Sequence, residues 1–174
     1  MPVFVNRPNR CPGINYSRPG FYFLTICVWE FNPVFGINDN GKIFLNEFGR
    51  IAEANWAAIP EHFPKIKLDE YIIMPDHIHG ILEIQPDCFP IGDADLRHLS
   101  GKPENYKPER MQMYLSKTIQ QYKSSVSREI RKIGYNGFRW QRSFYDHVIR
   151  DNLSLLRIQN YIRNNPIRHF RKSA

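Results

Sequence analysis

The chain has 174 residues, of which 42% are hydrophobic and 24% are charged. This length predicts one domain, or one domain with extensions, that is large enough to bury a sizeable core. No apolar run reaches the roughly 18 residues that a membrane span needs, and the amino-terminal segment lacks the apolar core of a signal peptide. We therefore expect a soluble, cytoplasmic protein with no membrane partner. Cys11, Cys27 and Cys88 are odd in number and lack metal-ligand spacing, so they are expected to be free thiols.

The positive charge of the chain is concentrated in its second half. Residues 1–100 carry 8 Lys or Arg and 12 Asp or Glu, whereas residues 101–174 carry 16 and 5, so the net charges are −4 and +11. A strongly basic half indicates a polyanionic partner, most often nucleic acid. The alternative is a basic face that is merely solvated.

The amino-terminal segment predicts an arm followed by short strands. Residues 1–19 are rich in proline and arginine and are expected to form an extended arm, so the folded domain spans residues 20–174. Aromatic and β-branched residues predict a first strand over Phe21–Trp29. A turn at Asn38–Lys42 then leads into a short strand, Lys42–Leu45.

A helix and a hairpin follow. Asn46 is the predicted N-cap of a helix from Glu47 to about Ile59, which Pro60 ends. Two β-branched runs separated by a tight break at Pro75-Asp76 predict a hairpin with the strands Lys67–Met74 and His77–Ile84. Residues 86–109 form a polar loop, and a loop of this length is usually functional or disordered.

The basic half of the chain predicts helix, strand and helix. Residues 110–133 have an apolar stripe at helical spacing, made of Leu115, Ile119, Tyr122, Val126, Ile130 and Ile133. Phe138–Ile149 is predicted as a fourth strand, and a last helix runs from Asn152 to about Asn164, where Pro166 stops it. This order of elements predicts an α+β fold: a ferredoxin-like antiparallel sheet with helices on one face and a further helix at the carboxyl end. Such a fold hosts many functions, so function has to come from the site.

Two histidines in the hairpin are candidate metal ligands. Strand side chains alternate between the two faces of a sheet, so His77 and His79 point to one face, and Ile78, Leu82 and Ile84 point to the other. Two imidazoles one residue apart on one strand face can clamp one metal ion. The alternative is a pair of histidines on a half-buried sheet with no ligand.

The last predicted helix carries a candidate nucleophile. Tyr161 and Asn165 are four residues apart and therefore neighbours on one helical face, beside the apolar stripe Leu155, Ile158 and Ile162. A tyrosine hydroxyl can attack a phosphodiester if positive charge counters its pKa of about 10. A metal ion held by the histidines would supply that charge, and the Asn165 oxygen could complete its shell. The alternative role for Tyr161 is packing.

A family resemblance rests on four motifs taken together: Met74-Pro-Asp-His-Ile-His-Gly80, Asn46-Glu-Phe-Gly-Arg50, Trp140-Gln-Arg-Ser-Phe-Tyr-Asp-His-Val-Ile-Arg-Asp151 and Tyr161-Ile-Arg-Asn-Asn-Pro166. In this order, over about residues 20–170, they resemble the HUH single-tyrosine transposases. The resemblance is greatest to the REP-associated tyrosine transposases, which are relatives of the insertion-sequence-200 type.

The resemblance implies a mechanism and a set of site residues. His77, His79 and Asn165 match the metal ligands of the family, and Tyr161 matches its nucleophile. Family members use Mg²⁺ or Mn²⁺, bind hairpins in single-stranded DNA, and cleave one strand to leave a 5′-phosphotyrosine and a free 3′-hydroxyl. Relatives act as monomers or as homodimers. One departure is Asp76, where relatives usually have asparagine.

Basic and aromatic residues of the second half are candidate DNA contacts. Lysines and arginines spread along the long helix and the predicted fourth strand could follow a DNA backbone: Lys117, Lys123, Arg128, Arg131, Lys132, Arg139 and Arg142. Trp140, Phe144 or Tyr145 could stack on bases. For each single residue, an ordinary surface or core position remains the alternative.

Two other functions fit parts of this pattern. A ferredoxin-like sheet with exposed aromatic residues can bind RNA or single-stranded DNA without catalysis. A metal-dependent phosphoesterase acting through activated water could use Glu83, on the same strand face as the histidines, and would form no covalent adduct. An active mobile element and an enzyme that only processes repeats have the same motifs.

Overall fold

The structure is a computed structural model that describes residues 19–86 and 114–173. Most of the expected amino-terminal arm and of the 86–109 loop lies outside the described residues, together with Cys11 and Cys88. The third cysteine, Cys27, is a buried free thiol, as expected. None of the helices in the described part of the chain combines the length and apolar character of a membrane span.

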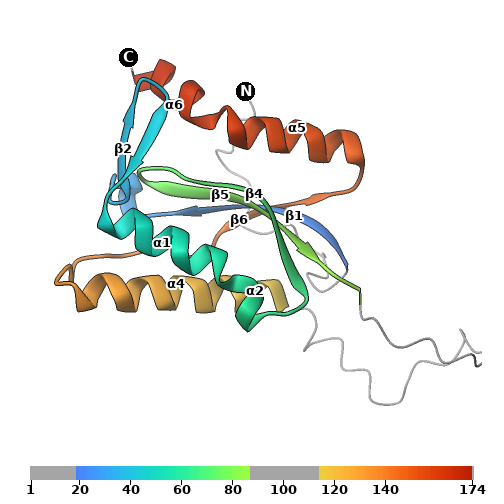
Figure 1. Cartoon of the computed structure of the whole chain (residues 1–174), viewed down its shortest axis with the longest axis horizontal. Coiled ribbons are helices and arrows are strands. Elements are labelled where there is room, and N and C mark those ends of the chain that lie inside the picture. Colours follow the sequence, from blue (N-terminus) through green and yellow to red (C-terminus); the bar gives the residue numbers. More distant parts are fainter. Residues whose placement is uncertain (1–18, 87–113, 174) are drawn as a thin grey trace, which may run out of the picture.

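A four-stranded sheet forms the centre of the molecule (Figure 1). Its strand order is β4-β5-β1-β6, and every neighbouring pair is antiparallel. The strands are β1 (Gly20–Cys27), β4 (Ile66–Ile73), β5 (His77–Ile84) and β6 (Tyr145–Ile149). This order is that of a ferredoxin-like sheet, so the predicted fold class is confirmed. The predicted hairpin of β4 and β5 is present, with a register shift between Leu68 and Tyr71.

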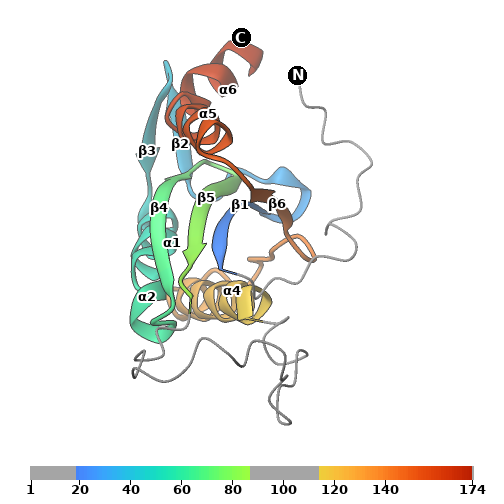
Figure 2. The same cartoon turned by 90° about the vertical axis from the view of Figure 1, so that its right-hand side faces the viewer.

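Helices cover both faces of this sheet (Figure 2). On one face lie α1 (Glu47–Ala57), α2 (Ile59–His62) and α4 (Tyr114–Lys132); across the other face runs α5 (Asn152–Arg163), followed by α6 (Asn165–Ser173). The predicted cap of α1 is present, because the Asn46 side chain accepts a hydrogen bond of 3.0 Å from the Gly49 amide. The sheet therefore separates α5 from α1, α2 and α4.

A separate two-stranded hairpin stands at one end of the sheet. It consists of β2 (Gly36–Asp39) and β3 (Lys42–Leu45). The sequence predicts β3 with these bounds but not its partner β2. Gly36 permits the pairing, because a Cβ atom built there would lie 2.1 Å from the carbonyl oxygen of Phe44. This hairpin packs against α6.

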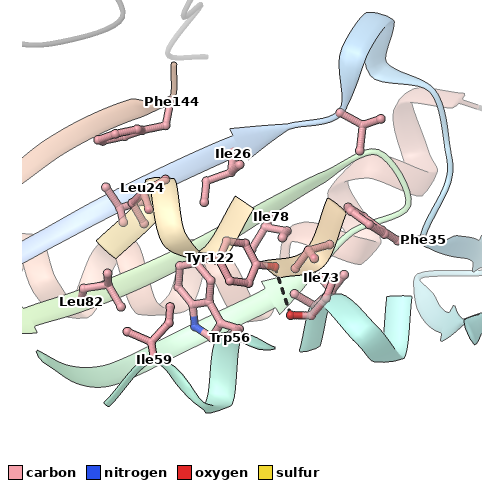
Figure 3. Close-up of a cluster of buried hydrophobic side chains, with 14 of the residues drawn as sticks. Leu24, Ile26, Phe35, Trp56, Ile59, Ile73, Ile78, Leu82, Tyr122 and Phe144 are labelled. Carbon is pink, nitrogen blue, oxygen red and sulfur yellow. Dashed lines mark hydrogen bonds between the residues drawn. The ribbon is translucent and has the colours of Figure 1, made fainter. Parts of the chain in front are cut away.

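The main core lies between the sheet and the helices α1 and α4 (Figure 3). Leu24, Ile26, Ile78 and Leu82 point into it from β1 and β5, around Trp56 of α1. The hydroxyl of Tyr122 donates a hydrogen bond of 3.0 Å to the carbonyl of Ala52, so the one polar atom of this buried ring has a partner. Ile78, Leu82 and Ile84 are buried on this face, as predicted.

Two predicted boundaries in the second half of the chain are wrong. The strand β6 begins at Tyr145, so the preceding segment with Arg139 and Arg142 is irregular and touches the sheet through a single bridge between Val28 and Trp140. The predicted stripe of α4 is buried except for Ile133, which lies beyond the end of the helix and is 44% exposed.

The chain also continues as a helix where a stop is predicted. Pro166 occupies the second position of α6, where its missing N–H costs nothing. Likewise, Pro60 lies in the first turn of α2 after α1 has ended. In both places proline marks the beginning of a new helix rather than the beginning of a loop.

Candidate active site beneath the carboxyl-terminal helices

His77 and His79 lie on one face of β5, as their period-two spacing predicts. Their ring centroids are 4.6 Å apart, and their Nε2 atoms are separated by 3.2 Å. His79 is buried, with 6% of its surface exposed, whereas His77 is half-buried. The two imidazoles thus converge on one point above the sheet, on the face that α5 covers.

The other ring nitrogen of each histidine has its own partner. The Nδ1 atom of His77 is 2.6 Å from a carboxylate oxygen of Asp76, and Nδ1 of His79 is 2.9 Å from the Thr25 hydroxyl. A carboxylate can only accept, so His77 donates from Nδ1, and in the neutral form of the ring its Nε2 carries the lone pair. Burial, followed by the charge of His77, holds the pKa of His79 well below its usual value. His79 is therefore a neutral imidazole, the form that binds metals.

Tyr161 reaches the histidines from α5. Its hydroxyl is 3.4 Å from Nε2 of His79, and its ring packs edge-on against Phe23 of β1 at a centroid distance of 6.0 Å. Burial raises the pKa of Tyr161, and this outweighs two neighbours that lower it: a hydrogen bond with the Asn165 side chain and the charge of Arg168. The hydroxyl is therefore protonated at neutral pH. Asn165 and Arg168 each favour its ionised form, although burial has the larger effect.

Asn165 joins the site from the first position of α6. It is a buried polar residue, with 6% of its surface exposed, and its side chain bonds to Tyr161. The next residue is anchored elsewhere, because the Asn38 side-chain amide donates a hydrogen bond of 2.8 Å to the carbonyl of Pro166. The hairpin of β2 and β3 therefore fixes the segment that carries Asn165.

Polar contacts to the edge strand β4 hold α5 in place. The Gln159 amide donates to both carboxylate oxygens of Asp69, at 2.8 and 3.1 Å, and the Arg163 guanidinium pairs with Glu70. Asp69 and Glu70 lie in the irregular part of β4, between Leu68 and Tyr71. Such bulges redirect side chains, and here both carboxylates reach α5 on either side of Tyr161.

The residues present fit a divalent ion. The Nε2 atoms of the two histidines are 3.2 Å apart and face each other, so both could donate to one ion placed beside them. No group of three or more His, Cys, Asp or Glu side chains with metal-site geometry occurs in residues 19–86 and 114–173, and an amide oxygen is a further donor that such an ion would accept. Asn165, buried beside Tyr161, carries such an oxygen.

Sequence reasoning missed several members of this site. Thr25 and Phe23 come from β1, and no sequence signal connects them with β5. Arg168, whose guanidinium lies 5.7 Å from the centre of the Tyr161 ring, and His169, whose ring centroid is 6.2 Å from that of His77, follow Tyr161 by seven and eight residues. Helical periodicity places both beside Tyr161 and Asn165. These two residues were not predicted, because the last helix was expected to end before Pro166, and they lie beyond it in α6.

The structure divides the predicted DNA contacts into three groups. Lys117, Arg128 and Arg131 are exposed on α4, on the opposite side of the sheet from Tyr161. Arg139 and Arg142 are exposed in the irregular segment before β6. Lys123 differs, because its ammonium donates to the backbone carbonyls of Gln141 and Ser143, and burial lowers its pKa to about 8. These contacts favour a structural role for Lys123.

The aromatic candidates for base stacking are mostly structural. Phe144 is buried in the main core. The Trp140 ring packs against Phe138 at 5.0 Å, and its N–H donates to the carbonyl of Lys123. Tyr145 is half-buried in β6. The exposed aromatic side chains of this region are instead Trp29 and Phe31, at 48% and 57% exposure, which the sequence does not single out.

Comparison with known proteins identifies relatives over nearly the whole chain. An uncharacterised protein of Haemophilus influenzae is 35% identical over 165 residues, which cover 95% of this chain and 90% of that protein. A second protein of the same organism, named "Putative REP-associated tyrosine transposase", is 25% identical over 161 residues, which cover 89% of this chain and 74% of the relative. No family model matches the chain.

A solved structure has the same fold. A REP-associated tyrosine transposase bound to a REP hairpin superposes with a TM-score of 0.58 at 17% identity, over 94% of this chain and 74% of the other. The strand order of the sheet is therefore shared with a REP-associated tyrosine transposase of known structure, and the sequence is similar to that of a second protein with this name.

Proposed function

We propose that this protein cleaves and rejoins single-stranded DNA at hairpins or repeats through a 5′-phosphotyrosine at Tyr161, with Mg²⁺ or Mn²⁺ as cofactor. One observation carries the proposal: the Tyr161 hydroxyl, from α5, lies 3.4 Å from the same Nε2 atom of His79 that faces His77. A nucleophile and a metal-binding pair thus meet at one point. The resemblance to a transposase bound to a REP hairpin supports the choice of substrate.

The chemistry is a transesterification that needs no external energy source. The Tyr161 oxygen forms a bond to phosphorus while the bond from phosphorus to the 3′ oxygen breaks. The proton that the phenol releases balances the proton that the leaving 3′ oxygen takes up. The bond energy stays in the phosphotyrosine, so the reverse attack by a 3′-hydroxyl rejoins the strand.

The surrounding residues prepare Tyr161 for this attack. Arg168, lying against its ring, and Asn165, bonded to its hydroxyl, both favour the phenolate. Phe23 fixes the ring from below, and the contacts of Gln159 and Arg163 fix the helix. His77, His79 and Asn165 would hold the ion. When bound, the ion would supply positive charge beside the scissile phosphate and the phenolate.

Exposed arginine and lysine side chains of the second half of the chain are candidate contacts to the substrate backbone. Arg131 lies in the last turn of α4, and it lines one pocket together with Arg139 and Arg142 from the segment before β6. Arg128 lies one turn before Arg131, whereas Lys117 lies in the first turn of α4. Phosphate neutralisation by these side chains makes binding salt-dependent through the release of counterions. We place Arg131, Arg139 and Arg142 near the cleaved strand, and Lys117, about four turns before Arg131 on α4, at a more distant part of the substrate.

The two alternative functions fit the geometry less well. Glu83, the base that a phosphoesterase would need, lies four positions from His79 along the strand, so the two Cα atoms are about 13 Å apart. A binding module without catalysis gives no reason for Tyr161 to contact a metal-binding pair.

The decisive experiment is a search for a covalent adduct. The protein is incubated with Mg²⁺ or Mn²⁺ and with a labelled single-stranded hairpin, and the products are separated under denaturing conditions. Wild-type protein should become labelled, and Tyr161→Phe, which removes one oxygen, should not. Both proteins should bind the hairpin equally well.

Tyr145→Phe is the matched control. Tyr145 lies on the same sheet face, because it is paired with Thr25, which is in turn paired with His79. Two strand spacings separate it from His79, about 10 Å. Its variant should form the adduct at the wild-type rate. An adduct on Tyr161→Phe, or a phosphotyrosine mapped to Tyr145, would overturn the assignment.

A further inference from the structure

A basic pocket lies outside the site that contains Tyr161 and the two histidines, and it includes the arginines proposed above as backbone contacts. It has a volume of about 370 Å³ and is lined by Trp29, Ser127, Arg131, Arg139, Trp140 and Arg142. Trp29 follows β1, Ser127 and Arg131 come from the last turns of α4, and the others come from the segment before β6. Three separate parts of the chain thus converge on it.

We propose that this pocket binds an unpaired nucleotide of single-stranded DNA, with the base stacked on Trp29 and the adjoining phosphates on the arginines. The inference rests on the proposed function, because it takes the substrate to be single-stranded DNA. It adds a second contact site for that substrate, outside the site that contains Tyr161, and a recognition residue, Trp29.

The charges of the pocket are available to a ligand. Arg131, Arg139 and Arg142 are all exposed, and within the described residues none of the three guanidinium groups has an ion-pair or hydrogen-bond partner. Three like charges around one pocket repel one another, and an anionic ligand relieves that repulsion. The Ser127 side chain adds a hydroxyl, a further donor for phosphate oxygens.

The aromatic surface is held out of the core by an unusual turn. Trp29 begins a short 3₁₀ segment, Trp29–Phe31, in which Glu30 and Phe31 have φ angles of +56° and +52°. Left-handed conformations of non-glycine residues cost about 1–3 kcal/mol each and concentrate at functional sites. This turn leaves Trp29 48% exposed, while the neighbouring Trp140 is packed on Phe138 and Phe35.

The pocket is rigidly connected to the histidine site. The amide of Val28 donates to the carbonyl of Asp76 at 2.8 Å, and the amide of Trp29 donates to the carbonyl of Arg139 at 2.9 Å. Cys27, two residues before Trp29, is paired with His77. A strand cleaved at Tyr161 can therefore continue around this end of the sheet into the pocket, where arginines neutralise its backbone and an aromatic ring takes a base, the combination that binds single strands.

The test is equilibrium binding of a short, unstructured oligothymidylate to the full chain over a series of salt concentrations. Trp29→Leu should weaken binding about tenfold without changing the salt dependence, because it removes stacking and no charge. Trp29→Phe should stay within about threefold of wild type, since it keeps an aromatic face. The double variant Arg139→Gln, Arg142→Gln should lower the slope of log affinity against log salt by about 1.4, or about 0.7 for each lost phosphate contact.

The matched control removes two charges at the opposite edge of the sheet: Lys65→Gln with Lys67→Gln, at β4. The inference fails if this variant weakens binding as much as the arginine pair does, if Trp29→Leu binds like wild type, or if plain duplex of equal length binds more tightly than the single strand. Adduct formation, measured separately, keeps the two proposals apart. An adduct with no effect of Trp29→Leu refutes only the pocket, and binding sensitive to Trp29 without any adduct refutes only the cleavage reaction.

Discussion

The two faces of the central sheet have opposite characters. On the face toward α1 and α4, the side chains of β1 and β5 are apolar, and they meet Trp56 and Tyr122 in a large buried cluster. On the face toward α5, the apolar cluster is small, with Phe23, Ile81, Ile149 and Ile162 as its buried members. Beside it lie the polar groups Thr25, His77, His79, Tyr161 and Asn165.

The contrast teaches how a single strand can serve two purposes. Along β5, stability and chemistry alternate residue by residue: His77 and His79 face the polar site, and Ile78 and Gly80 face the core. Gly80 belongs to this division, because a Cβ atom there would lie 2.3 Å from the Trp56 ring. Substitutions of neighbouring residues should therefore have unlike consequences, and each of the following variants tests that separation.

The largest effect is expected for His77→Ala. Loss of a ligand to the ion removes several kcal/mol of charge stabilisation, so adduct formation should fall by about 10³-fold or more. Because His77 is half-buried and outside the apolar clusters, the free energy of unfolding should change by less than about 1 kcal/mol. Denaturant titration and the adduct assay measure the two quantities. A large loss of stability would mean that the polar face also holds the fold together.

Ile78→Ala should show the reverse pattern. Ile78 is fully buried in the main core, so its truncation should lower the free energy of unfolding by about 2–5 kcal/mol. Under conditions where the variant is folded, it should form the adduct within about threefold of the wild-type rate. A strongly reduced rate in folded protein would show that the two faces are coupled through the strand.

Asp76→Asn concerns the link between His77 and its partner. The amide oxygen can still accept the hydrogen bond from Nδ1, but the negative charge that strengthens the imidazole as a ligand is lost. Substitution of such partners typically lowers metal affinity about 10–100-fold. Calorimetric titration with Mn²⁺ measures this directly, with the exposed Asp39→Asn as the charge-matched control. An unchanged affinity for Mn²⁺ would show that Asp76 contributes to the turn between β4 and β5 and not to metal binding.

The smallest effect is expected at the contact between α5 and β4. Gln159→Leu removes the hydrogen bonds to Asp69, which should cost about 1 kcal/mol of stability. Tyr161 would be held less firmly, so adduct formation should slow about fivefold without a change in hairpin affinity. An unaltered rate would show that Phe23 and the anchoring of α6 are sufficient to position the nucleophile.

The periodic parts of this architecture are predictable from the sequence. Alternation along β5 and the helical stripe of α4 are local patterns that packing preserved, and the Asn46 cap is made within three residues. The pairing of His77 with His79 follows from the same alternation. Tyr161 and Asn165 were also accessible, because their spacing is that of helical neighbours even though a short break between α5 and α6 separates them.

The remainder depends on contacts between distant segments. The segment before β6 has strand-like composition, but Trp140 packs into the core, and Lys123 bonds to the carbonyls of Gln141 and Ser143. The segment meets β1 only at the bridge between Val28 and Trp140. Thr25 reaches His79 only because β1 lies beside β5. The exposure of Trp29 follows from the left-handed turn after it, and nothing in the residues Glu30 and Phe31 predicts such a conformation.

The contact between Tyr161 and His79 lies within one polypeptide, and α6 is tied to the hairpin of the same polypeptide through Asn38 and Pro166. One chain therefore carries both the proposed nucleophile and the proposed metal ligands. A genetic consequence follows for cells that carry two defective copies, one with His77→Ala and one with Tyr161→Phe. If each site is built from one chain, the two alleles should fail to complement, and purified mixtures of the two proteins should be as inactive as either alone. Activity restored in the mixture would show that Tyr161 and the histidines of one site come from different molecules.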